Sequence, residues 1–249
     1  MDSSAQSSSP HGGDYFVTTR WTLVLSAGRK SSAQSDQALA ELCQTYWYPL
    51  YAYVRQRVAS REEAEDLVQA FFARFLEKNY LAGLSSERGK FRAFLLASLK
   101  HFLSNEWDKA RRQKRGGQVP HLSLDWQSAD DRYQHLDPPD PTSPDRLFDR
   151  EWALALLERV VEVLRRELEA EGKGDLFEGA KAFLTVGSEA IPYGAAALKL
   201  GMEEQALRVA VHRLRKRYRQ LLRAEISQTL VDPAGVEEEL AALRVALAG

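Results

Sequence analysis

The sequence predicts an all-α protein, built from two small helical domains that a proline- and aspartate-rich linker joins. Apolar residues recur at spacings of three and four in two long stretches, which is the period of a helix with one buried face. Between these stretches, five prolines occur from Pro120 to Pro144, and no helical or strand period persists. Gly201 divides the last helical stretch into a short and a long helix. The expected divisions are an N-terminal tail with a short apolar segment (1–35), a first helical domain (36–115), the linker (116–148), a second helical domain (149–226) and a C-terminal extension (227–249).

Composition and charge exclude several classes of protein. Lys and Arg number 34 against 35 Asp and Glu, so any affinity for nucleic acid must come from local basic patches. Cys43 is the only cysteine, which excludes an intrachain disulfide and a cysteine zinc cluster, and the five histidines lack ligand spacing. The N-terminus lacks the apolar core of a signal peptide, and no apolar run approaches the roughly 18 residues of a membrane span. We therefore expect a cytoplasmic protein without a metal, a cofactor or membrane insertion.

The first domain opens with a helix at Asp36, after an apolar segment at 15–27 that fits either a strand or a helical turn. Pro49 either interrupts this helix or starts the next one. The clearest helix is Ser60–Lys78, whose first residue forms a capping box with Glu63 and whose apolar residues make a full core face. Its opposite face suits either a solvated surface or a docking surface, and it carries Glu62, Glu65, Asp66 and Gln69.

A glycine- and serine-rich loop at 82–90 precedes a long helix, Phe91–Arg112, which leads into the basic run RRQKR. One face of this helix is apolar. The other is polar and mostly basic, and it carries Arg92, Lys100, His101, Asn105, Lys109 and Arg112. Trp107 lies among these residues. An exposed aromatic ring beside cations suits stacking on unpaired bases, and a partly buried structural tryptophan fits the pattern equally well.

The second domain begins with helices at 150–171 and 176–186, and it ends in the stretch Tyr193–Arg223. This stretch predicts a helix-turn-helix, because Gly201 can adopt the left-handed conformation that ends a helix and Ala197 permits a close crossing. The face opposite the apolar stripe of the second helix carries Gln205, Arg208, His212, Arg213, Arg215, Lys216 and Arg219. That pattern is typical of a recognition helix, with the solvated basic face of an ordinary amphipathic helix as the alternative.

Together these segments resemble a bacterial RNA polymerase sigma factor of the sigma-70 family, of the extracytoplasmic-function type. Three motifs carry the resemblance. Arg61–Lys78 (REEAEDLVQAFFARFLEK) is similar to the polymerase-binding helix of region 2, and Phe91–Arg115 resembles the helix that opens and reads the −10 element. Tyr193–Arg223 resembles the region 4 helix-turn-helix that reads the −35 element. Their order and the acidic linker also match, and the resemblance covers residues 38–225.

The resemblance implies a role for each polar face. Glu62, Glu65, Asp66 and Gln69 would bind the clamp helices of the polymerase β′ subunit, and region 4 would meet the β flap. The opened −10 strand would be bound by Arg92, Lys100, His101, Asn105, Trp107, Lys109 and Arg112, and the loop Leu84–Lys90 would capture a flipped base. The −35 duplex would be bound by Gln205, Arg208, His212, Arg213, Arg215, Lys216 and Arg219. An anti-sigma factor or another regulator would be a further partner.

The sequence departs from the family pattern at two positions. His101 stands where the family often has asparagine, and Ala195 stands where it often has glutamate. The family pattern therefore does not determine which −10 and −35 sequences this chain would prefer.

Two other functions can be weighed from the residues. A free-standing helix-turn-helix regulator that dimerises on a palindrome would explain Tyr193–Arg223 but not the pair of helices at 60–78 and 91–115. A metal-dependent nuclease using Glu62, Glu63, Glu65 and Asp66 is disfavoured, because these carboxylates follow one helix turn and do not converge from separate elements. We therefore expect a promoter-specificity subunit without catalytic activity of its own.

Overall fold

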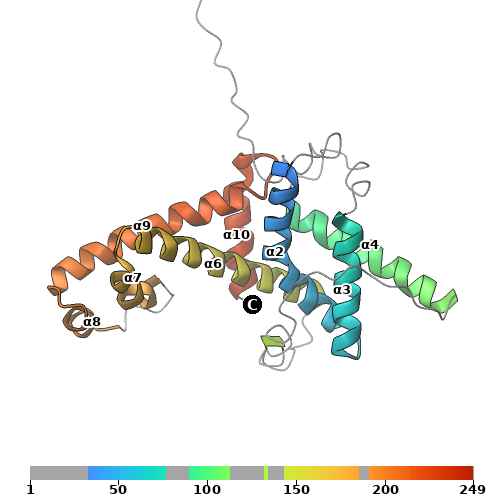
Figure 1. Ribbon diagram of the computed structural model, residues 1–249, viewed down its shortest axis with the longest axis horizontal. Helices are drawn as coiled ribbons and strands as arrows, with labels where there is room; N and C mark the ends of the chain where they lie inside the picture. Colours follow the sequence, from blue (N-terminus) through green and yellow to red (C-terminus); the bar gives the residue numbers. More distant parts are fainter. Residues whose placement is uncertain (1–32, 77–89, 113–131, 134–142, 185–190, 249) are drawn as a thin grey trace, which may run out of the picture.

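The computed structural model (Figure 1) describes the chain in five stretches, residues 33–76, 90–112, 132–133, 143–184 and 191–248. Within these stretches the regular structure is helical, with one isolated antiparallel bridge between Lys90 and Leu230, which confirms the all-α prediction. None of the described helices is long and apolar enough to span a membrane. The expectations for the apolar segment 15–27, the loop 82–89 and most of the linker fall outside the described residues.

The α-helices are α2 (Ala33–Arg55), α3 (Arg61–Leu76), α4 (Phe91–Arg112), α6 (Pro144–Ala170), α7 (Gly174–Ala180), α8 (Tyr193–Lys199), α9 (Glu204–Ser227) and α10 (Val236–Ala248). Two short 3₁₀ helices, η1 (Lys181–Leu184) and η3 (Pro233–Gly235), lie between them.

Helices α2, α3 and α4 pack around a core rich in aromatic rings. The apolar stripe of α3 is buried as its spacing predicts, and the Phe71 ring lies 5.7 Å from the Phe102 ring of α4 in an edge contact. The cap of α3 also forms, because the main-chain N–H of Glu63 donates to the Ser60 hydroxyl at 3.1 Å. Pro49 lies inside α2 and does not end it. It is buried among buried neighbours, so core packing offsets the missing backbone hydrogen bond.

Helix α6 connects the two halves of the molecule (Figure 1). Its 27 residues span about 40 Å. Trp152 and Leu156 belong to the aromatic core with α2, whereas Val160 and Leu164 belong to a second core. The sequence placed the start of this helix at Arg150, which is six residues too late. The helix begins at Pro144 behind the cap residue Ser143, because proline fits the first helical position and needs no backbone donor there.

The second core is formed by the end of α6 together with α7, η1, α8 and α9. Phe177 and Phe183 fill its centre, and Leu207, Val211 and Leu214 of α9 pack against them as one buried stripe. These three leucine and valine positions are those that the helical period of the sequence assigns to the interior.

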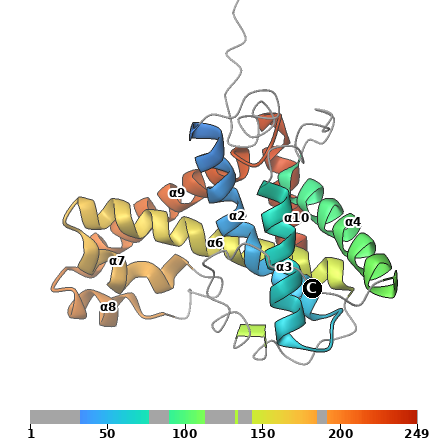
Figure 2. The ribbon, with the colours of Figure 1, turned by 45° about the vertical axis from the view of Figure 1, so that its right-hand side comes forward.

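The C-terminal segment, residues 228–248, returns to the first core. As the sequence predicts, α9 ends before Asp232–Pro233 and a short closing helix follows. The Asp232 carboxylate accepts a hydrogen bond from the main-chain N–H of Ala234, which caps η3. Leu243 of α10 is then buried in the core that α2, α3 and α4 form. Figure 2 shows α10 crossing α6, with which it is in contact. The last helix of the chain is thus packed against the first core.

Candidate nucleic-acid interface

Helices α8 and α9 are joined by a tight corner at Gly201. Gly201 has a φ of +63°, the left-handed conformation that an L side chain rarely adopts. The N–H of Met202 then donates to the Ala197 carbonyl at 3.1 Å, which closes the end of α8. A Cβ built on Gly179 would come within 2.6–2.8 Å of the Leu200 side chain, so α7 approaches this corner as closely as a glycine permits. The packing of α7 against the corner and of α9 against the second core therefore fixes the orientation of α9.

The outward face of α9 carries six of the seven polar residues predicted there, all exposed: Gln205, Arg208, His212, Arg213, Lys216 and Arg219. Arg208 is held in place, since its guanidinium pairs with Glu204 at 2.6 Å and lies 4.4 Å from the centre of the Tyr193 ring. Val209, which is 43% exposed, lies among these polar residues. Sequence reasoning missed it, although an apolar side chain on a basic helix face is the chemistry that contacts a thymine methyl group.

Arg215 departs from the expectation of an exposed phosphate contact. Its side chain is half-buried, and its Nε–H donates to the Phe183 carbonyl oxygen at 2.9 Å. This bond joins α9 to η1 beside the second core. The residue follows the buried Leu214 directly, so it lies at the border of the apolar stripe and turns toward the core.

The cations of α9 fall into two groups. Arg217 is paired with Glu167 of α6 at 2.6 Å, and Arg223 is paired with Glu237 of α10. Arg213, Lys216 and Arg219 are exposed and make no ion pair within the described part of the chain. Because unpaired exposed cations attract phosphates most strongly, this second group has the charge that a DNA backbone would require.

The polar face of α3 is only partly open. Glu62 and Asp66 are exposed, and Glu65 pairs with Arg61 at 2.5 Å. Gln69 is only 5% exposed, which contradicts the expectation of an exposed docking residue. It directly follows the buried Val68 and lies at the edge of the buried stripe, which is wide enough to include it. Glu62 and Asp66 are therefore the open part of this face.

The middle of α4 keeps part of the predicted strand-facing surface. Lys100, His101 and Lys109 are exposed, and the half-buried Asn105 lies within 3.2 Å of the His101 ring nitrogen. Trp107 is half-buried and packs against the aromatic core, which is the structural alternative for this ring. Arg112 ends α4, and its side chain lies outside the described residues.

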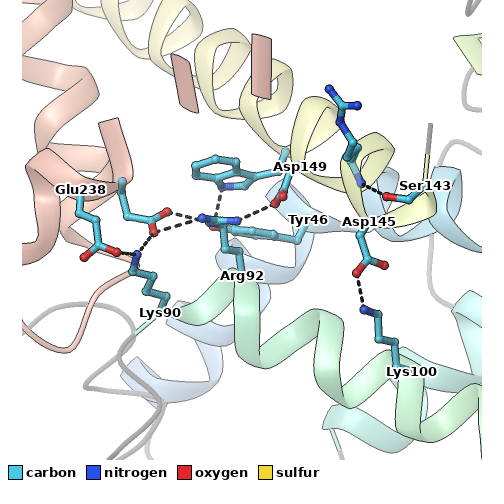
Figure 3. A network of polar contacts seen from close by, with 11 residues as sticks. Tyr46, Lys90, Arg92, Lys100, Ser143, Asp145, Asp149 and Glu238 are labelled. Carbon is cyan, nitrogen blue, oxygen red and sulfur yellow. Dashed lines mark hydrogen bonds and ion pairs between the residues drawn. The ribbon is translucent and has the colours of Figure 1, made fainter. Parts of the chain in front are cut away.

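Arg92 does not face an open surface, contrary to the expectation for a strand-binding residue. Figure 3 shows its guanidinium inside a network that joins α4, α6 and α10. Its Nε–H donates to Glu239 at 2.7 Å, another N–H donates to Asp149 at 2.6 Å, and the group stacks 4.5 Å from the Trp152 ring centre. The Trp152 indole N–H in turn donates to the Tyr46 hydroxyl at 3.1 Å.

Three further ion pairs extend this network at the start and in the middle of α4 (Figure 3). Lys90 pairs with Glu238 at 2.7 Å and with Glu239 at 2.8 Å, and Lys100 pairs with Asp145 at 2.6 Å. The acidic partners were visible in the sequence as a run at 237–239 and as linker aspartates, but nothing local in the sequence paired them with α4.

Glu239 is the centre of the network and is 1% exposed. Burial by itself would raise the pKa of Glu239, but the hydrogen bonds from Arg92 and Lys90 outweigh it and the pKa is lowered. The same contacts raise the pKa of Arg92 against the opposing effect of its burial. Burial raises the pKa of Asp149 despite the nearby Arg92. Arg92 and Glu239 therefore form a charged pair.

The arrangement offers separate surfaces for separate partners. A basic helix face at one end suits duplex DNA, a partly basic helix at the other suits a single strand, and an acidic helix face suits a basic protein partner. The described residues contain no cluster of histidine, cysteine or carboxylate side chains that could hold a metal ion.

Comparison with known proteins identifies one part of the chain. Residues 42–113, less than a third of the sequence, match the family model of sigma-70 region 2, and this segment contains most of α2 together with α3 and α4. No curated protein and no solved structure matches the chain. This segment is therefore similar to region 2 of the sigma-70 family, whose members act in promoter recognition and transcription initiation.

Proposed function

We propose that this protein is a sigma factor of the extracytoplasmic-function type, which binds a promoter at two elements. The α9 face reads the −35 duplex, α4 holds the opened −10 strand, and the acidic face of α3 binds the β′ clamp helices of core polymerase. The β flap and an anti-sigma factor stay predicted partners.

The single observation that best supports this proposal is the combination of two features in one chain. A segment that matches sigma-70 region 2 is followed by two helices with a tight corner, and the second helix exposes Arg213, Lys216 and Arg219, which have no ion partner among the described residues. A region 2 segment would bind polymerase and an opened DNA strand, and a basic recognition helix would bind duplex DNA. A promoter-specificity subunit needs both.

The chemistry assigned to each surface follows from its charges. Arg213, Lys216 and Arg219 neutralise phosphates and set the affinity, whereas Gln205, Arg208 and His212 near the start of α9 reach base edges. On α3, the carboxylates of Glu62 and Asp66 make charge-assisted contacts to a basic partner helix. On α4, His101 and Asn105 offer hydrogen bonds to an unpaired base.

Transcription from a library of genomic fragments with purified core polymerase tests the proposal. We expect start sites that require this chain and that share two sequence elements upstream. Core polymerase alone, and core polymerase with an Arg213→Ala and Lys216→Ala double variant, are the controls. A chain that binds one duplex sequence tightly and never directs polymerase would instead be the free-standing regulator.

A further inference from the structure

The C-terminal segment, residues 228–248, is bound to the start of α4, about 140 residues earlier in the chain. The backbone of Lys90 pairs with that of Leu230 in an antiparallel bridge, and the Phe91 N–H donates to the Thr229 carbonyl at 3.0 Å. The side chains of Glu238 and Glu239 then hold Lys90, as Figure 3 shows for the first of them. The contact thus combines main-chain pairing with ion pairs.

The cations held here lie on α4, or directly before it in the case of Lys90, and the proposed function assigns this helix to the −10 strand. Lys90 and Arg92 are bound by α10, and Lys100 is bound by Asp145 of α6. The acceptors are carboxylate oxygens, which have the charge and hydrogen-bonding capacity of backbone phosphate oxygens. While these pairs are closed, the first turns of α4 present little unpaired positive charge to a nucleic acid.

We propose that the C-terminal segment is an intramolecular latch, an acidic competitor that closes the start of α4 to the single-stranded promoter and must leave before initiation. This inference rests on the proposed function. The latch covers Lys90 and Arg92 and leaves the α9 face open, so the closed chain retains duplex binding and lacks strand binding. Competition between carboxylates and phosphates for the same cations then couples the opening of the latch to the arrival of the strand.

The construction of the latch is consistent with reversible release. Helix α10 has only 13 residues, which is too short to be stable in water without packing. Its contact with α4 is partly open to solvent, since the Lys90 side chain is 26% exposed and that of Glu238 is 73% exposed. The buried side chains of the whole segment are four, Thr229, Leu230, Glu239 and Leu243. A polyanion can therefore displace the segment without unfolding the rest of the chain.

A covalent lock tests the latch with its own internal control. Residues paired across an antiparallel bridge have Cα atoms about 4.5–5.5 Å apart, which is within the range of a disulfide. The double variant Lys90→Cys and Leu230→Cys can therefore be locked by oxidation. The native Cys43 does not compete, because it is buried and burial raises its pKa to about 12.

We expect the oxidised double variant to direct run-off transcription with core polymerase at least ~10-fold less than the same protein after reduction. Oxidised and reduced wild-type chains should be equally active. Equal activity of the locked and reduced variant would overturn the latch. A wild-type chain that directs no initiation at all would instead refute the proposed function, so the two failures are distinguishable.

A charge variant tests the same idea without polymerase and without a cysteine. The full chain with Glu238→Gln and Glu239→Gln frees Lys90 and one side of Arg92. Binding to a fluorescent 20-nucleotide single strand should tighten, and its salt dependence should steepen by about 0.7 for each freed cation. The matched control is Glu167→Gln with Glu178→Gln, which removes two carboxylates and frees Arg217 and Lys181 in the second domain.

The control pair carries the same change in net charge but frees cations away from α4. It should therefore steepen the salt dependence of strand binding by less than half as much. If the control tightens strand binding as much as the α10 variant does, the effect is one of overall charge and the latch is overturned. If the α10 variant unfolds in a thermal melt, Glu238→Gln alone replaces it. This milder change is at an exposed side chain, and no gain in strand affinity from it would equally overturn the proposal.

Discussion

Lys216 and Arg217, which are neighbours in α9, allow a direct test of which side of this helix meets duplex DNA. Lys216 is exposed and makes no ion pair within the described residues, whereas Arg217 is turned toward α6 and pairs with Glu167 at 2.6 and 2.8 Å. Replacing either by alanine removes one positive charge from the same helix turn. The two variants therefore have the same net charge and differ in where the charge is removed.

The magnitude follows from the number of unpaired cations. If Arg213, Lys216 and Arg219 each neutralise one phosphate, the logarithm of the binding constant falls with that of the salt concentration with a slope of about −2.7. Between 50 and 200 mM salt the wild-type affinity should then fall about 40-fold, against about 12-fold for Lys216→Ala. Arg217→Ala should keep the wild-type slope and lower stability by less than about 1 kcal/mol, because the pair with Glu167 is substantially exposed.

Fluorescence anisotropy with a duplex that carries a mapped −35 element, at four salt concentrations, measures these slopes. The quantity compared between variants is the slope of the logarithm of the binding constant against that of the salt concentration. A small loss of folded protein changes single affinities but not this slope. An Arg217→Ala slope as shallow as that of Lys216→Ala would mean that α9 meets DNA through another side. The assignment of Arg213 and Arg219 would then also be wrong.

Three further predictions concern packing, polymerase binding and acid stability. Gly179→Ala should lower the free energy of unfolding by about 1–3 kcal/mol in urea titrations, because a Cβ there overlaps Leu200, whereas Gly174→Ala should change it little since its Cβ meets only an ordinary contact. Asp66→Lys should abolish the pull-down of core polymerase while its helical circular dichroism stays unchanged; retained binding would show that α3 docks through another face. The pKa of Glu239 is lowered in the folded chain, so its contribution to stability is fully present above about pH 4.3, the ordinary value of a glutamate, and is lost as the pH falls through the lowered value. Urea titrations between pH 3 and 6 should therefore show a steeper loss of stability for wild type than for Glu239→Gln, and parallel curves would contradict the charged pair.

Features that depend on neighbouring residues could be predicted from the sequence. The cap of α3 at Ser60 forms because its donor is only three residues away. The corner at Gly201 forms because the backbone conformation there is a property of glycine itself. The buried stripes of α3 and α9 follow the helical period, so the faces opposite them were also placed correctly in outline.

Features that depend on distant partners could not be predicted. Arg92 follows the pattern of an exposed cation until Glu239, 147 residues later, is placed against it. Arg215 and Gln69 each directly follow a buried residue, at the edge of the apolar stripe of their helix. Whether a side chain at such an edge is exposed depends on how far the packed neighbours extend around the helix, and not on the helical period. The span of α6 across both cores is likewise a tertiary property, since its sequence has the same period on both halves.

The most direct test of the central claim is run-off transcription from a single mapped promoter with purified core polymerase and this chain. We expect transcripts only when both proteins are present, and their loss when either the −35 or the −10 element is replaced by unrelated sequence. Transcripts that do not depend on the chain, or initiation that survives replacement of both elements, would contradict this claim.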